Sequence, residues 1–186
     1  MHDDSDVKIF KANRGDNDNS ELYAVAEELK FHVLNGNSAK AKQLGKELAS
    51  LSPESENLIN ELTETLEADW IMPEIRNQLR LLMVFSAEYT LLSELCPMLA
   101  TSASEAFYNE MRNSAPDFYN GISNGAAMSF YYMAVKQYDT AKAVGESFAM
   151  LCNAKTDERI LDLGSKVFLL TCKHIVKIID GYTFEK

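Results

Sequence analysis

Apolar residues recur every three or four positions along almost the whole chain after residue 20, and this spacing is the strongest constraint on the fold. An α-helix turns once every 3.6 residues, so such spacing gathers the apolar side chains on one face that packs against a core. Two clear examples are residues 22–33 and 160–178. No segment alternates with the two-residue period of a strand for long enough to compete. The sequence therefore predicts an all-α fold.

Proline, glycine and capping residues divide this periodic region into about eight helices. Pro53 suits the first turn of a helix, where its missing N–H costs nothing. Residues 102–105, Ser-Ala-Ser-Glu, fit a capping box that opens a short helix. We expect stacked helical hairpins or two related three-helix halves. The expected helices begin near residues 20, 38, 53, 73, 102, 117, 139 and 156, and the last one closes at Gly181.

The chain divides into a short polar lead and one long helical region. Residues 1–19 carry five Asp and no long apolar run, so we expect a mobile acidic lead rather than a secretory signal. Residues 20–186 are expected to form a single all-helical domain. With 186 residues, 46% of them hydrophobic, the chain is long enough to bury a sizeable core.

Charge and cysteine usage exclude several classes of partner. The net charge of −10 argues against nucleic-acid binding. No apolar run reaches the roughly 18 residues that a membrane-spanning helix needs, because Lys173 and Lys177 interrupt the best candidate. Three cysteines are an odd number and lie beside apolar residues, which favours free thiols in a reducing compartment. We expect a cytoplasmic protein without cofactors.

One short pattern occurs twice. Ala-Lys-Gln-Leu-Gly at residues 41–45 returns as Ala-Lys-Ala-Val-Gly at residues 141–145, and the register holds from Leu48 with Phe148 to Leu51 with Leu151. Small residues four apart let a neighbouring helix approach closely. We therefore expect a repeated helix-turn-helix, in which Gly45 and Gly145 each contact another helix at close range.

The second copy, residues 130–151, resembles a tetratricopeptide repeat. The resemblance rests on Tyr132 in the first helix, Gln-Tyr-Asp at residues 137–139 in the turn, and Ala141 after it. It departs from that family in two ways, because the bulky and small residues of the second helix are reversed and the 34-residue period is missing. The resemblance implies stacked helical hairpins with a concave face lined by first helices, where Phe130 and Met133 would lie.

The spacing of the histidines and carboxylates in the sequence does not indicate a complete set of metal ligands. Glu28 and His32 are four residues apart and share a helix face, but a third donor is not nominated, so we expect a salt link or a surface pair. His174 lies on the apolar stripe of the last helix, which favours a buried structural histidine. The Glu-x-x-His pairs of di-iron bundles are absent. No metal site is expected.

No catalytic nucleophile emerges either. Cys96 precedes Pro97 at the end of the expected fourth helix, and this end of a helix dipole does not stabilise a thiolate. Residues 121–125 match Gly-x-Ser-x-Gly, but the nucleophile elbow needs a buried strand before the serine, and none is predicted. We expect a bend or a tight helix contact at Gly121 and Gly125 instead, and no catalytic residues.

The sequence thus favours a protein–protein interaction or regulatory module over an enzyme. The candidate binding residues are Phe130 and Met133, with a protein, a peptide or a second copy of the chain as partner, and burial of both side chains in the core is the alternative. Three lysines spaced by seven and four residues share one face of the last helix: Lys166, Lys173 and Lys177. We expect a solvated face there, with docking against an acidic partner, or against the acidic part of a second copy, as the alternative. A helical-bundle enzyme or small-ligand-binding protein, with a site assembled from distant residues, remains the alternative function.

Overall fold

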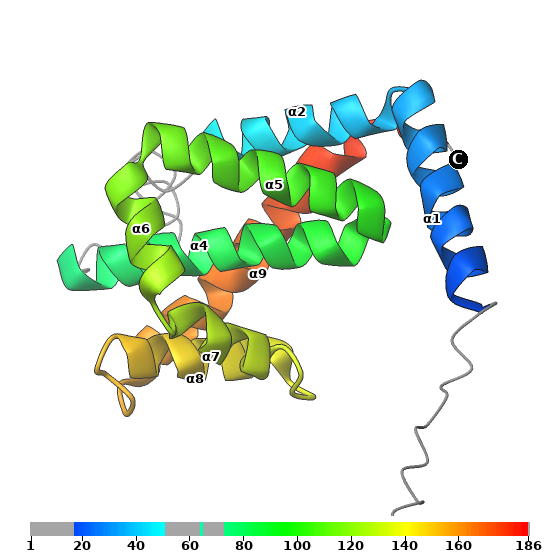
Figure 1. The fold of residues 1–186 in the computed structure, drawn as a ribbon. Helices are drawn as coiled ribbons and strands as arrows, with labels where there is room; N and C mark the ends of the chain where they lie inside the picture. The colour runs from blue at the N-terminus through cyan, green and yellow to red at the C-terminus, as the bar shows by residue number, and fades with distance from the viewer. Residues whose placement is uncertain (1–16, 51–63, 65–72, 186) are drawn as a thin grey trace, which may run out of the picture.

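The computed structural model describes residues 17–50, 64 and 73–185. Within these residues the chain forms helices and no strand, so the all-α prediction is confirmed (Figure 1). Apart from residue 64, which is helical, the helix expected to begin at Pro53 lies outside the described residues, as does most of the acidic lead. The helices are α1 (Asn17–Leu34), α2 (Asn37–Ser50), α4 (Pro73–Glu94), α5 (Pro97–Ser114), α6 (Pro116–Asn124), α7 (Ala127–Ala134), α8 (Thr140–Leu151) and α9 (Glu158–Asp180).

Three helix boundaries differ from those expected. α1 begins at Asn17, three residues before the expected start, so the last residues of the expected mobile lead are helical. α5 begins at Pro97 rather than at the capping box, because Pro97 occupies its first turn and the preceding Cys96 is extended. The helix expected from residue 117 to 136 is broken into α6 and α7, since Gly125 is extended and ends α6. A bend is therefore present at Gly125. Gly121 makes no tight contact, because nothing lies within 4 Å of the position of a Cβ there.

Two apolar clusters form the interior, and α4 and α9 contribute to both. The first cluster joins α4 and α9 to α7 and α8, around the buried side chains of Phe85 and Phe148. The second joins them to α2 and α5, around Leu91 and Phe107. Figure 1 shows the same arrangement, with α2 and α5 on one side of the α4–α9 pair and α7 and α8 on the other.

The repeated glycines lie where two helices touch. A Cβ at Gly45 would collide with the backbone carbonyl of Ala103 in α5, and one at Gly145 would collide with Ser165 and the carbonyl of Leu161 in α9. Close contact at both glycines is confirmed. The burial pattern also repeats, because positions 44, 45, 48 and 49 and their counterparts 100 residues later are all buried. The resemblance to tetratricopeptide repeats stays an expectation.

The apolar stripe of α1 is not buried. Leu22, Val25, Leu29 and Val33 are between 48% and 67% exposed, so the expected packing of this stripe against the core is wrong for the described residues. α1 packs mainly against α2, at the sharp corner where Gly36 takes a positive φ of 80°. In Figure 1, α1 lies at one end of the molecule and runs away from the other helices.

Candidate functional site

The two residues that the sequence nominates for binding lie on the surface of α7. Phe130 is 43% exposed and Met133 is 63% exposed, so the alternative that they are core residues does not hold. They are three residues apart and therefore neighbours on one helix face. Both line an open groove of about 860 Å³, which is also bounded by α8, by the turn between α7 and α8, and by Leu161 of α9.

The groove has an apolar lining and a charged rim. Phe130 and Met133 line it together with the apolar side chains of Met150 and Leu161, and methionine side chains adapt their shape to different apolar partners. Asp139, Lys142, Glu146 and Lys155 supply charges of both signs at the rim. The Asp139 carboxylate also accepts the backbone N–H of Lys142 at 3.3 Å, which caps α8 and fixes the turn. The surface suits an apolar side chain flanked by polar groups.

The neighbouring aromatic residues divide between the interior and the groove. Tyr131 is fully buried and stacks on Phe85 with ring centroids 5.1 Å apart, while Tyr132 meets Phe85 edge-on at 5.2 Å. Tyr138, at the turn, is fully exposed and lines the groove. Burial raises the pKa of Tyr131 above its usual range. One face of α7 thus packs in the core, and another face lines the groove.

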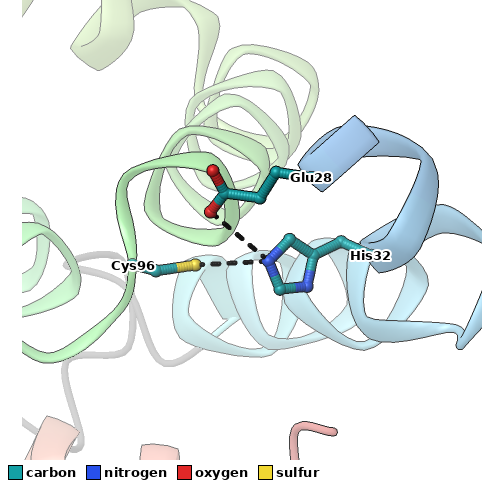
Figure 2. Close-up of side chains that lie close together, drawn as sticks. All are labelled: Glu28, His32 and Cys96. Carbon is teal, nitrogen blue, oxygen red and sulfur yellow. Dashed lines mark hydrogen bonds and ion pairs between the residues drawn. The ribbon is translucent and has the colours of Figure 1, made fainter. Parts of the chain in front are cut away.

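A second site joins Glu28, His32 and Cys96, as Figure 2 shows. His32 Nε2 lies 3.8 Å from Glu28 Oε1 and 3.7 Å from Cys96 Sγ. Glu28 and His32 come from successive turns of α1, whereas Cys96 is the second of the two residues between α4 and α5. The Glu28–His32 pair expected from the sequence is therefore present, but His32 is buried rather than exposed. Cys96 is the third donor that the sequence did not nominate.

Cys96 lies where two helices meet. The sequence placed it at the C-terminal end of the preceding helix, but α5 begins at Pro97 and Cys96 is its N-cap. The expected fourth helix accounts for only the first of the two helix ends that meet at Cys96.

A buried amide orients the His32 ring. Asn37 Nδ2 lies 3.0 Å from His32 Nδ1 and also donates to the backbone carbonyl of Glu185 at 2.8 Å. The N–H of Glu185 donates in turn to Asn37 Oδ1 at 2.9 Å. These two backbone bonds fix which end of the amide faces the ring. The amide nitrogen can only donate, so Nδ1 accepts and the neutral ring carries its proton on Nε2.

The residues after α9, 181–185, begin with a turn and form a C-terminal tail that contacts α2. Besides the Glu185 contacts with Asn37, Lys40 Nζ donates to the carbonyl of Thr183 at 2.6 Å and the Tyr182 hydroxyl donates to Glu47 Oε2 at 2.5 Å. The C-terminus accordingly lies beside the corner between α1 and α2 in Figure 1. The end of the chain thus contacts the residue that orients His32.

The other two cysteines are held in apolar surroundings. All three cysteines are free thiols. Burial raises the pKa of Cys152 to about 12, and it also raises the pKa of Cys172. These two thiols are therefore poor nucleophiles and poor metal ligands near neutral pH.

The remaining candidates on α9 do not form a site among the described residues. His174 is exposed, so the expectation that it is buried is wrong; the buried stripe passes instead through Thr171 and Ile175. Lys166, Lys173 and Lys177 are exposed, and Lys166 lies 2.7 Å from Asp162. No helix in the part of the chain that the structure describes is long and apolar enough to cross a membrane.

Fold and sites together define an all-helical protein with an open groove at one end and a Glu–His–Cys cluster at the other. No known protein family, curated protein or solved structure matches the chain.

Proposed function

We propose that the chain is a protein–protein interaction or regulatory module that holds a peptide segment of a partner protein in the groove between α7 and α8. The observation that carries this proposal is the exposure of Phe130 and Met133 over an open apolar groove. Leaving two large apolar side chains in water is unfavourable, and a partner that covers them recovers this hydrophobic free energy.

The shape and charge of the groove favour a peptide with one or two apolar anchor residues. Its volume of about 860 Å³ accommodates several side chains. The charges of both signs at the rim, Lys142 and Glu146 on α8 among them, suit a segment in which polar residues flank the anchors. An amphipathic helix, with anchors three or four residues apart, matches the spacing of Phe130 and Met133.

Selection of peptides against the full-length protein tests the proposal. Peptides recovered from a random display library are expected to share apolar anchors, and fluorescence anisotropy then measures their affinity for variants. Phe130→Asp and Met133→Asp are each expected to weaken binding at least about tenfold, because each places a carboxylate against the anchor. Leu169→Asp is the matched control, since Leu169 is 54% exposed on α9 and does not line the groove.

Circular dichroism of each variant confirms that the fold is kept. Peptides that bind both groove variants as tightly as the wild type would show that the groove is not the binding surface. Sedimentation velocity separates a peptide partner from a second copy of the chain. A wild-type dimer that becomes a monomer on Met133→Asp substitution would assign the groove to self-association instead.

A further inference from the structure

We propose that Glu28, His32 and Cys96 bind a divalent cation of the zinc type, and that docking of the C-terminal tail at Asn37 opposes this binding. The three side chains bring one carboxylate oxygen, one imidazole nitrogen and one sulfur together, all within 4.8 Å of one another. The site is separate from the groove of the proposed function, so each is tested independently.

The distances are close to those of a tetrahedral zinc site. Zinc holds sulfur at about 2.3 Å and nitrogen or oxygen at about 2.0–2.1 Å, which places sulfur and nitrogen about 3.5 Å apart and nitrogen and oxygen about 3.4 Å apart. The observed separations from His32 Nε2 are 3.7 Å to Cys96 Sγ and 3.8 Å to Glu28 Oε1. Both separations from His32 Nε2 therefore need to shorten by only a few tenths of an ångström, and the carboxylate oxygen and the sulfur, which lie within 4.8 Å of each other, need to approach as well.

The chemistry of the donors selects the class of cation. A sulfur and an imidazole nitrogen favour borderline-soft ions such as Zn²⁺ or Co²⁺ over Mg²⁺ and Ca²⁺, which prefer oxygen ligands. Such an ion binds Cys96 as the thiolate, so its binding releases the thiol proton. Three protein ligands leave the fourth tetrahedral position to an exogenous ligand.

Asn37 connects this site to the C-terminal tail. A cation at His32 Nε2 displaces the proton from that nitrogen, so the neutral ring must carry its proton on Nδ1 and needs an acceptor there. Asn37 presents an NH₂ group to Nδ1, and it presents its oxygen only if the amide turns over. Turning the amide breaks both of its hydrogen bonds to the backbone of Glu185. Cation binding and tail docking therefore weaken each other reciprocally.

Occupancy of the site ties α1 to the rest of the molecule. Glu28 and His32 belong to α1, whose other tertiary contacts are mainly with α2, whereas Cys96 belongs to the junction of α4 and α5. A bound cation is thus a cross-link between the exposed apolar helix and the core. Docking of the C-terminal tail at Asn37 opposes cation binding and therefore releases this link between α1 and the core.

Titration of the full-length protein with Co²⁺ tests the site, because thiolate ligation gives a charge-transfer band in the near ultraviolet. One equivalent is expected to produce this band, and Zn²⁺ is expected to bleach it by displacement. Cys96→Ser is expected to abolish the band, while the Cys152→Ser/Cys172→Ser double variant keeps it. A band that survives Cys96→Ser, or no band in the wild type, overturns the proposal.

Two matched comparisons refine the test. Glu28→Gln is expected to weaken Co²⁺ binding at least about tenfold, whereas Glu27→Gln, at the exposed neighbouring position, leaves it unchanged. Deleting residues 183–186 removes the Glu185 contacts with Asn37 and is expected to tighten binding several-fold. Equal affinity of the truncated and full-length proteins overturns the coupling to the tail.

Discussion

At the scale of single residues, the two repeated glycines are required because the backbone of a neighbouring helix leaves no room for a side chain. Gly45 packs against the carbonyl of Ala103, and Gly145 packs against the carbonyl of Leu161 as well as the side chain of Ser165. Backbone atoms of a buried helix cannot move aside without disturbing the helix itself. A side chain at either position therefore cannot be accommodated without displacing packed backbone atoms, which is energetically costly.

We expect Gly45→Leu and Gly145→Leu each to lower the free energy of unfolding by roughly 1–3 kcal/mol through overpacking. Gly121→Leu is the matched control, because Gly121 is exposed in α6 and has open space at its Cβ position. This control is expected to stabilise the protein slightly, by up to about 1 kcal/mol, since leucine favours helix over glycine. Urea denaturation measures the free energy of unfolding of all three variants. Equal stability of the Gly45 variant and the wild type would contradict the packing argument.

The sequence predicts the Glu28–His32 pair of the Glu–His–Cys cluster, but it does not predict that the fold brings Cys96 beside that pair. The Glu28–His32 pair follows from a four-residue spacing, which the sequence displays directly. Cys96 joins them from 64 positions further along the chain, and only the packing of α1 beside the α4–α5 junction brings it there. The same limitation explains Cys96 as an N-cap, because its electrostatic environment depends on where the second of two adjoining helices begins.

At the scale of elements, the periodicity of apolar residues predicts a helix but does not show what covers it. The stripes of α8 and of most of α9 are buried, whereas the equally regular stripe of α1 is exposed. A sequence pattern reports that a face is apolar, and burial depends on whether a neighbour has room to receive it. The break between α6 and α7 at Gly125 was likewise underestimated, because a single glycine is often tolerated in a helix.

We expect the backbone amides of residues 22–31 in α1 to exchange hydrogen faster than those of residues 82–91 in α4. The α1 residues have exposed side chains and few tertiary contacts, so their helix opens locally, whereas the α4 residues lie largely in the core. Hydrogen exchange followed by mass spectrometry measures both segments. Exchange in α1 as slow as in α4 in dilute solution would contradict this expectation. Protection that appears only at high protein concentration would show that a second copy covers α1.

At the scale of the whole molecule, the C-terminal tail is held to α2 by three separate contacts. The one at Tyr182 responds to pH. Burial, together with the hydrogen bond to Glu47, raises the pKa of Tyr182 to about 12 in the folded protein. The usual pKa of tyrosine is about 10. The folded state therefore holds the phenol proton more tightly than the unfolded state does.

We expect the stabilisation from this contact to be complete below pH 10 and to be lost as the pH rises from about 10 through about 12. Tyr182→Phe removes the titrating group and keeps the ring that stacks on Phe184. The difference in urea midpoint between the wild type and this variant, measured across the pH range, isolates the effect from other tyrosines. A difference that stays constant from pH 9 to pH 12 would show that the Glu47 contact does not stabilise the fold.

The sharing of α4 and α9 between both apolar clusters makes the described fold cooperative. Each of these helices contributes side chains to both clusters: Leu82 of α4 and Leu163 of α9 lie in the first, and Leu91 of α4 and Ile175 of α9 lie in the second. Melting one cluster unwinds part of a helix and removes the support on which the rest of that helix depends. Unfolding of either cluster is therefore expected to disturb both the groove, which includes Leu161 of α9, and the position of Cys96, which follows α4.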